Sequence, residues 1–426
     1  MPEGSFGRSA WQARRPLEGM ARLDGDVAVD VAIVGGGYCG LVTALMLARA
    51  GRTVQVIEAG EIGEGASGLN GGQVIPGLKY DPETLLARFG SAGPRLVDFA
   101  ASTADSVFDL IKRENLDVPV VRNGWIQAAH TVTALELARE RDRQWRARGA
   151  DAQLLSADDI ARMTGAKGYI GGWLDRRAGT IDPLAYVSEL ARIAGEAGAR
   201  ISTGTRALRL NHRDDMWSVE TSTGAVVTAR HVVVATNAYS DGLVPGLART
   251  LVPLHSFQVA TAPLPERLAQ QILPGNQAVS DSRRILVYYR KSPDGRLVLG
   301  GRGRMAVPRS AADWKHLERA LLRLYPDLEG VAIERRWFGR VGMTPDHVPH
   351  LHAPEPGLIA VAGCQGRGVG LMTALGQAIA RYIISGNPED LPFPLSAIRP
   401  IPFHAFRQVG VAAAILWYRT LDAFEK

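Results

Sequence analysis

Three glycines, Gly35, Gly37 and Gly40, interrupt an apolar part of the chain at a spacing that suits phosphate binding. The apolar run 31–34 before them is typical of a strand buried on both faces, and the run 41–50 after them is long enough for a covered helix. The first glycine permits a tight turn, the second lets a pyrophosphate approach the backbone, and the third lets the helix pack against the strand. The phosphates then meet the positive end of the helix. We therefore predict the pyrophosphate site of a dinucleotide here.

Glu58 completes this unit at the end of a second apolar stretch, 53–57. Its carboxylate is able to accept both hydroxyls of a ribose. The separation from Gly35 is close to the roughly 20 residues typical of units that bind a dinucleotide. A lone glycine-rich turn is a weak signal, but here a strand, a helix, a second strand and an acid occur in the required order.

The segment from Ala66 to Gln73 distinguishes FAD from NAD as the dinucleotide. Glycines and small polar side chains fill it: Ser67, Gly68, Asn70, Gly71, Gly72 and Gln73. A loop of this kind can lie along a flavin ring through its backbone, whereas an NAD-binding protein has no obvious use for it. The sequence also lacks a second glycine fingerprint for a nicotinamide. We therefore expect FAD as the cofactor.

The composition bounds the possible partners. A chain of 426 residues is too long for one ordinary core, so we expect two domains. The net charge of +6 raises the question of nucleic-acid binding, but the arginines between residues 139 and 148 alternate with acidic residues, as on a solvated helix. Because no basic stripe with stacking aromatic residues is present, we expect no nucleic acid as a partner.

The cysteines and the apolar runs bear on the compartment. Cys39 and Cys364 lie far apart and neither belongs to a paired motif, which favours a reducing environment and a cytoplasmic protein. Residues 1–28 lack the apolar core of a signal peptide. The apolar run 409–418 is too short to cross a bilayer, so no transmembrane segment is expected.

Periodicity and turn residues predict the remaining elements. Helices are expected over 81–114, over 131–148, from Pro183 and over 369–385, and strands over 123–129, 200–210, 231–235 and 357–362. From about residue 250 the chain changes to short alternating segments, which predict an antiparallel sheet: 251–261, 285–291, 296–300 and 333–340. The turn 292–295 joins two of them as a hairpin.

This order predicts an α/β fold in which a discontinuous Rossmann-like FAD-binding domain carries an inserted α+β substrate domain built on an antiparallel sheet. We assign 26–95, 150–250 and 341–390 to the FAD-binding domain. The substrate domain comprises 96–149 and 251–340, and a C-terminal tail comprises 391–426.

Several motifs, taken in order, resemble one known family. They are the glycine unit at 35–40, Ala-Ser-Gly-x-Asn-Gly-Gly-Gln at 66–73, Tyr-Tyr-Arg at 288–290, Gly-Gly at 300–301, Thr-Pro-Asp at 344–346 and Gly-Cys-Gln-Gly-Arg-Gly-Val at 363–369. The chain resembles the FAD-dependent amine oxidoreductases of the D-amino-acid oxidase superfamily, and within it the γ-glutamylputrescine oxidases. The likeness runs from about residue 28 to the end.

The resemblance implies how the flavin is held. A helix N-terminus at 366–369 would face its pyrimidine end, where hydride transfer leaves negative charge. Some relatives bind the flavin through a cysteine in the stretch matching 340–343, where this chain has none, so non-covalent FAD is expected. We expect the following cofactor contacts: Gly35, Gly37, Tyr38, Cys39, Gly40, Glu58, Ala59, Ser67, Gly68, Asn70, Gly71, Gly72, Gln73, Ala207, Ala235, Asn237, Gly366, Arg367, Gly368 and Val369.

Two residues depart from the pattern of the family. Relatives usually carry His at the position of Arg367 and Arg at the position of Leu69. Arg367 either strengthens the stabilisation of an anion or points into solvent. The change at Leu69 removes whatever contact the arginine makes in relatives.

The implied reaction is oxidation of a C–N bond. Hydride passes from the carbon of a neutral amine to flavin N5, water converts the imine to an aldehyde and ammonia, and oxygen or another acceptor reoxidises the flavin. Sarcosine oxidases hold the substrate carboxylate with basic residues at positions that match Pro76 and Gly370 here, which bind no anion. A simple N-methyl amino acid is therefore a poor fit, and a γ-glutamylputrescine-like amine, with its acidic group far from the reacting carbon, fits better.

Substrate contacts are harder to name because the cofactor performs the chemistry. Our candidates are Gln73, Tyr289, Arg302, His255 and Arg367; the other interpretation is a core tyrosine, a structural ion pair and a structural histidine. His347, His350 and His352 alternate, but with no acidic or thiol partner nearby in sequence we expect no metal site.

Two further functions stay open. One is a flavin dehydrogenase of D-amino acids or N-methyl amino acids that passes electrons to a membrane quinone, for which the basic stretch 407–419 is the only indication. The other is a flavoprotein subunit with a binding or structural role. Oxygen consumption during turnover separates the first from an oxidase, and a flavin that stays oxidised with every amine would identify the second.

Overall fold

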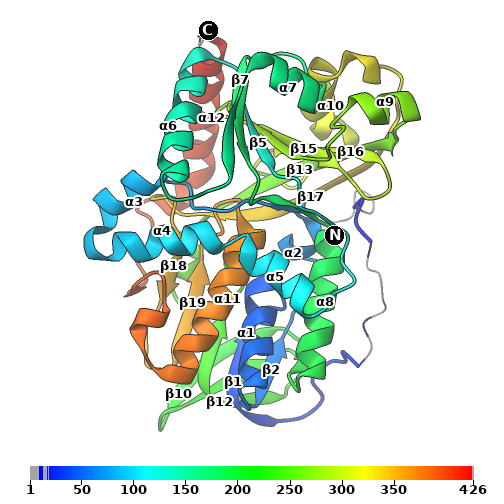
Figure 1. Ribbon diagram of the computed structural model, residues 1–426. Helices are drawn as coiled ribbons and strands as arrows, with labels where there is room; N and C mark the ends of the chain where they lie inside the picture. Colours follow the sequence, from blue (N-terminus) through cyan, green and yellow to red (C-terminus); the bar gives the residue numbers. More distant parts are fainter. Residues whose placement is uncertain (1–8, 13–16, 18, 425–426) are drawn as a thin grey trace.

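The computed structural model describes residues 9–12, 17 and 19–424. A nine-stranded mixed sheet forms one half of this described part (Figure 1). At its centre run five strands in the order β19-β12-β1-β2-β9, each parallel to its neighbour. They are β19 (Leu358–Ala362), β12 (Val226–Val234), β1 (Val27–Val34), β2 (Val54–Ile57) and β9 (Arg200–Ser202). Val, Ile and Ala dominate these strands because both faces of the sheet are covered.

Three helices pack together over one face of this sheet (Figure 1): α1 (Tyr38–Arg49), α8 (Pro183–Glu196) and α11 (Gly368–Ser385). α8 begins where the sequence predicts, with Asp182 accepting hydrogen bonds from the first-turn N–H groups and Pro183 at the first helical position. Strands β10 (Ala207–Arg213) and β11 (Met216–Thr221) extend β12 as an antiparallel meander. The short strands β18 (His350–His352) and β20 (Leu395–Ser396) form the opposite edge.

A second sheet of eight strands forms the other half, in the order β17-β13-β16-β15-β14-β5-β7-β6. Its strands are β5 (Trp125–Ala129), β6 (Ala152–Leu155), β7 (Gly171–Asp175), β13 (Val252–Pro263), β14 (Ala278–Asp281), β15 (Val287–Lys291), β16 (Arg296–Arg302) and β17 (Ile333–Met343). All neighbours are antiparallel except β14 and β5. The predicted hairpin at 292–295 joins β15 to β16. The predicted fold class, an α/β chain with a second sheet that is largely antiparallel, is confirmed.

The remaining elements connect or cover the two sheets. A small antiparallel sheet consists of β3 (Gln73–Val74), β8 (Gly179–Ile181) and β4 (Val120–Val121). The other α-helices are α2 (Ala66–Leu69), α3 (Pro82–Phe89), α4 (Gly93–Ser102), α5 (Asp105–Arg113), α6 (Val132–Arg146), α7 (Ala157–Thr164), α9 (Glu266–Gln271), α10 (Lys315–Leu324) and α12 (Arg407–Phe424).

Two predicted elements are divided in the structure. The helix expected over 81–114 consists of α3, α4 and α5, and the first break falls at Gly90, whose φ is +51°. The strand expected over 200–210 consists of β9 and β10, separated by Gly204 with a φ of +56°. At both breaks a glycine adopts a backbone conformation that other residues avoid, so an apolar pattern that looks continuous is interrupted.

The assignment of segments to domains remains a proposal, but two segments associate differently from our assignment. Strands β6 and β7 lie within 150–250, which we gave to the FAD-binding domain, yet they hydrogen-bond in the eight-stranded sheet. Helix α5 lies within 96–149, which we gave to the substrate domain, yet it packs against α11. Periodicity identifies each element but does not determine which sheet it joins.

The proposed C-terminal tail, 391–426, carries β20 and α12, and its last two residues lie outside the described part of the chain. Along this tail the side chains of Phe403, Phe406, Val409 and Trp417 are exposed. Among the described residues, no helix is both long enough and apolar enough to cross a membrane.

Candidate active site

A cavity of 1030 Å³ is lined by residues from both large sheets. The nine-stranded sheet contributes the turn after β1, the end of β2 and the end of β12, and α11 contributes its first residues. The eight-stranded sheet contributes residues of β5, β13, β14, β15, β16 and β17. Small-molecule pockets occupy about 300–1,000 Å³, so this cavity is large enough for a dinucleotide and a second ligand.

The glycine turn after β1 lines the cavity. Gly35 has a φ of +111°, and a Cβ at Gly40 would lie 2.0 Å from the carbonyl oxygen of Gly35, so only glycine allows α1 to approach the strand this closely. Gly37 is the N-cap of α1 and offers no side chain, and the first turn of α1 contains no acidic residue. The helix N-terminus is therefore suited to an anion such as a pyrophosphate.

Glu58 lies at the cavity wall directly after β2. Its Oε2 accepts a hydrogen bond from the N–H of Gly36 at 2.7 Å, and its Oε1 accepts one from the N–H of Gly60 at 2.9 Å. These two bonds fix the carboxylate beside the phosphate-binding turn. A ribose attached to the bound pyrophosphate would meet it there.

Tyr38 and Asn70 organise the loop that follows. The N–H of Tyr38 donates to Ser67 Oγ at 3.1 Å, and the hydroxyl of Tyr38 donates to the carbonyl of Ser67 at 2.5 Å. Asn70 Nδ2 donates to the same hydroxyl at 3.0 Å, and its Oδ1 accepts from the N–H of Gly72 at 2.8 Å. Burial raises the pKa of Tyr38 well above its ordinary value, so the hydroxyl remains a donor.

Three of the predicted cofactor contacts lie behind the cavity wall, outside the lining: Gly40, Gly68 and Gly72. A Cβ at Gly68 would lie 2.0 Å from the carbonyl oxygen of Gly63, and one at Gly72 would lie 2.2 Å from that of Ile181. These glycines are required by backbone packing behind the loop. The other predicted cofactor residues line the cavity.

The N-terminus of α11 lines the cavity through Gly366, Arg367, Gly368 and Val369. Arg367 is the N-cap residue, and the first turn of α11 contains no acid. Its guanidinium donates to the carbonyl of Pro76 at 2.5 Å and lies 5.7 Å from the ring centre of Trp125. Burial lowers the pKa of Arg367 to about 10, which leaves it charged at neutral pH. Of our two alternatives for Arg367, the structure therefore contradicts a side chain that points into solvent.

These features fit FAD. The N-termini of two helices, α1 and α11, line one cavity together with the acid Glu58 and residues of the segment 66–73. Gln258 also lines the cavity and is fully buried; its Nε2 donates to the carbonyl of Leu69 at 2.7 Å, while its Oε1 has no hydrogen-bond partner among the described residues. A buried acceptor without a partner is costly, so a donor from a bound group is expected there.

The structure corrects our choice between two adjacent tyrosines on β15. Tyr289, predicted to contact substrate, is fully buried in the hydrophobic core beside the eight-stranded sheet, with its ring centre 5.8 Å from that of Tyr325. Tyr288 lines the cavity instead, and its hydroxyl is hydrogen-bonded to Ser256 Oγ at 2.8 Å. Because successive side chains of a strand point to opposite faces, only one of the pair can face the cavity. A Cβ at Gly300 would lie 2.2 Å from the Tyr288 ring, so this glycine makes room for it.

The other predicted substrate contacts line the cavity, and protein groups hold Gln73 and His255 as they hold Arg367. Gln73 Nε2 donates to the carbonyls of Val279 and Tyr289 at 3.2 and 3.3 Å, which connects the segment 66–73 to the eight-stranded sheet. His255 Nδ1 donates to the carbonyl of Arg304 at 3.1 Å. Arg302 lies at the end of β16 and lines the same cavity.

Residues that we did not predict as contacts also line the cavity: Lys79, Gln127, Gln258, Arg284, Tyr288, and Trp125, which we expected in the core. Alternation along β15 indicates that only one of its two tyrosines faces the cavity, but it does not identify which one. No pattern in the sequence identifies Lys79, because it lies in a loop. We inferred from Pro76 and Gly370 that this part of the site has no cationic group for a substrate carboxylate. Lys79, three residues after Pro76, and Arg367, three residues before Gly370, nevertheless bring cationic groups to the cavity.

The alternating histidines near residue 350 make protein contacts. His350 Nε2 lies 3.0 Å from Asp346 Oδ2, so an acidic partner does lie beside these histidines, contrary to our expectation. The rings of His350 and His352 are 5.4 Å apart. Within the described part of the chain, no three or more His, Cys, Asp and Glu side chains are grouped to hold a metal ion.

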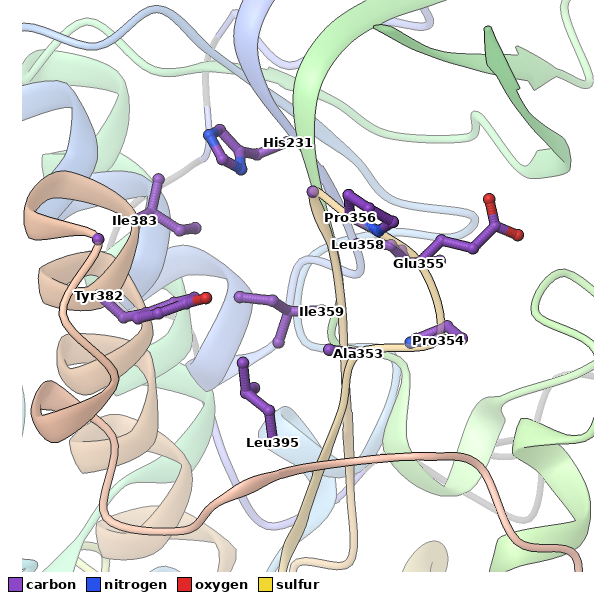
Figure 2. A pocket seen from close by; sticks show the side chains of 12 residues that line it. His231, Ala353, Pro354, Glu355, Pro356, Leu358, Ile359, Tyr382, Ile383 and Leu395 are labelled. Carbon is purple, nitrogen blue, oxygen red and sulfur yellow. The ribbon is translucent and has the colours of Figure 1, made fainter. Parts of the chain in front are cut away.

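A second cavity of 380 Å³ lies elsewhere in the molecule (Figure 2). Ile359, Ile383 and Leu395 line it together with His231, Tyr382 and Glu355. None of the predicted site residues belongs to its lining. It is about a third of the size of the first and has no glycine turn or helix N-terminus suited to phosphate, so we do not assign the cofactor to it.

Comparison with known proteins agrees with this site. The family described as DAO, FAD dependent oxidoreductase, matches residues 30–382. The chain is 32% identical over 413 residues, 94% of each chain, to a probable oxidoreductase OrdL of Rhizobium meliloti (strain 1021). It is also 32% identical over 398 residues to the gamma-glutamylputrescine oxidoreductase of Escherichia coli (strain K12), covering 90% of this chain and 92% of that protein.

A solved structure has the same fold. The glycine oxidase of Geobacillus kaustophilus superposes with a TM-score of 0.71 at 24% identity, over 84% of this chain and 95% of that one. The glycine turn, the flavin loop and the α11 terminus thus occur in one cavity of a chain that matches this family over most of its length. The chain therefore belongs to the DAO family of FAD-dependent oxidoreductases.

Proposed function

We propose that this protein oxidises the C–N bond of a γ-glutamylputrescine-like amine. The carbon next to the nitrogen loses a hydride and the nitrogen loses a proton, and water converts the resulting imine to an aldehyde and ammonia. When bound, FAD supplies the two-electron acceptor, and oxygen is reduced to hydrogen peroxide in regenerating it. We further propose that FAD is held without a covalent bond and that the protein is cytoplasmic.

The observation that carries this proposal is that the N-termini of α1 and α11 line the same cavity. The N-terminus of α1 suits the pyrophosphate, and Glu58 suits a ribose. The α11 end, with Arg367 beside it, suits the pyrimidine ring, where a positive potential favours the negative charge that a transferred hydride brings. The relative from Escherichia coli, 32% identical, supports the choice of amine.

The remaining space belongs to the substrate. Tyr288 and Ser256 offer hydroxyl groups, and Trp125 offers an aromatic wall. His255 Nδ1 donates to a carbonyl, which holds its ring at the cavity wall, and we propose that the imidazole of His255 receives a proton from a substrate ammonium. The walls hold the amine over the flavin and exclude water.

Anaerobic reduction of the flavin tests this function. The purified yellow protein is mixed without oxygen with γ-glutamylputrescine, free putrescine, sarcosine and D-alanine in turn, and the visible absorbance of oxidised flavin is followed. We expect γ-glutamylputrescine to bleach it and air to restore the colour with release of hydrogen peroxide. Bleaching by sarcosine or D-alanine alone would overturn the proposal. Acid precipitation should release the flavin, because the FAD is non-covalent.

A second function, an amino-acid dehydrogenase that uses a membrane quinone, is kept because of the exposed apolar side chains near the C-terminus, Phe403, Phe406, Val409 and Trp417. Reduction by D-amino acids with reoxidation by a soluble quinone but not by air would favour it over the oxidase.

A further inference from the structure

Lys79 presents its side chain to the cavity from the loop between β3 and α3. The side chain is exposed, and it lines the cavity. The amino group is therefore accessible to a ligand that enters the cavity. No hydrogen bond or ion pair joins it to any of the described residues.

The neighbouring charges do not neutralise Lys79. Arg367 and Arg141 both repel its charge and, together with burial as the larger cause, lower its pKa to about 8. The carboxylates near these arginines are already engaged: Asp81 accepts from Arg141 at 2.8 and 2.9 Å, and Asp175 pairs with Arg177 at 2.6 Å. This part of the wall is therefore cationic.

A ligand that fills the cavity would displace the solvent around this ammonium, and a ligand carboxylate would then replace the lost solvation by pairing with it. A carboxylate is also the group that Lys79 and Arg367 together would attract to this wall. A free diamine, which carries two positive charges, would be repelled by the same groups.

We propose that Lys79 binds the carboxylate of the substrate, so that the protein selects amines that carry a carboxylate and rejects free diamines. This inference rests on the proposed function, since it concerns the same cavity. It adds a residue that determines specificity and the chemical class of the group that it recognises.

Two matched compounds and two variants test the role of Lys79. Glutarylputrescine keeps a carboxylate, whereas γ-aminobutyrylputrescine is γ-glutamylputrescine without its carboxylate. Lys79→Met removes the charge at nearly constant length, and Lys167→Met removes an exposed lysine outside the cavity lining. A lost charged hydrogen bond corresponds to about a 10- to 100-fold change, so we expect Lys79→Met to raise KM for glutarylputrescine and γ-glutamylputrescine by that factor. Its KM for γ-aminobutyrylputrescine, which carries two ammonium groups, should fall or stay unchanged, because the repelling charge of Lys79 is gone. Every KM of Lys167→Met should stay within about twofold of wild type.

Binding of glutarate, measured by calorimetry without any turnover, separates this inference from the proposed function. Loss of glutarate binding in Lys79→Met supports the anion site even if no amine reduces the flavin, in which case only the proposed function fails. Equal KM changes for compounds with and without the carboxylate would overturn the inference, because Lys79 would then act on the flavin or on the fold. Unchanged glutarate binding would overturn it as well.

Discussion

At the scale of single residues, most polar groups of the cavity have hydrogen-bond partners within the protein, and a few have none among the described residues. Glu58, Tyr38 and Asn70 are held by hydrogen bonds, so they are positioned before any ligand arrives. Lys79 and the Oε1 of Gln258 have no such partners among the described residues. These two mark where ligand groups are expected.

The lowered pKa of Lys79 predicts how anion binding depends on pH. Its pKa in the folded protein is about 8, so the ammonium form that attracts glutarate is present below that pH and is lost above it. Affinity for glutarate should be constant from neutral pH to about 7.5 and then fall by about tenfold for each pH unit well above 8. Calorimetric titrations across this range measure the effect. In Lys79→Arg the fall should move to much higher pH, and an unchanged profile in that variant would contradict the assignment.

The same pKa predicts the sign of a stability effect. Because the folded value lies below the ordinary value of 10.5, the charged lysine destabilises the fold at neutral pH, and this penalty disappears as the pH rises from about 8 to 10.5. The Tm of Lys79→Met at neutral pH should therefore be no lower than that of wild type. A marked drop in Tm would indicate a structural role for this side chain.

The two adjacent tyrosines of β15 predict opposite outcomes. Tyr289→Ala should lower the free energy of unfolding by about 3–5 kcal/mol, because it empties a fully buried position. Tyr288→Phe removes one hydrogen bond, to Ser256, and should change stability by no more than about 0.5–1.5 kcal/mol while changing substrate affinity. Denaturant unfolding and KM measured on both variants test this. A change of substrate affinity in Tyr289→Phe but not in Tyr288→Phe would reverse the assignment.

At the scale of elements, the βα unit that we propose as the pyrophosphate site was predictable, because its glycines have only one compatible arrangement. Apolar runs fix the buried strand and the covered helix, and three glycines fix the turn between them. The break at Gly90 within 81–114 was not predictable in the same way, since the apolar pattern continues through it. The side of β15 that faces the cavity also required the structure, because its two tyrosines are equally suited to either face.

A pair of glycine variants tests the close approach of α1 to β1. In Gly40→Ala the new Cβ would lie 2.0 Å from the Gly35 carbonyl oxygen, so the helix must shift and the phosphate site is lost. We expect this variant to be purified without flavin and with a lowered Tm. Gly195→Ala is the matched control: it lies in α8 with open space around it and should be stabilised by about 0.5–1 kcal/mol with flavin retained. Full flavin content in Gly40→Ala would contradict the placement of the pyrophosphate.

At the scale of the whole molecule, the cavity depends on segments from most of the chain brought together by two sheets. Alternation and turn residues predicted a parallel sheet and a second, largely antiparallel sheet. They did not predict that β6 and β7 join the second sheet or that α5 packs on α11, because such pairings are set by long-range contacts. Lys79 escaped prediction for the same reason: only the packing of its loop beside α11 brings it to the cavity.

The cavity lining ends, along the sequence, at Met372, and no residue of the tail contributes to it. Removing residues 408–426 should therefore leave flavin content and the reduction of flavin by γ-glutamylputrescine unchanged. Flotation with anionic vesicles, compared between the full chain and the shortened one, tests whether the exposed side chains of the tail serve the quinone-linked alternative. Loss of flavin on shortening would show that the tail supports the cavity.

The measurement that tests the central claim most directly is rapid-mixing anaerobic reduction of the flavin by γ-glutamylputrescine and by putrescine, each over a range of concentrations. The claim is that one cavity holds FAD and selects an amine with a carboxylate. It predicts that γ-glutamylputrescine reduces the flavin with saturation, and that putrescine reduces it far more weakly or not at all. Equal reduction by both compounds would contradict the selection of a carboxylate, and reduction by neither would contradict the proposed reaction.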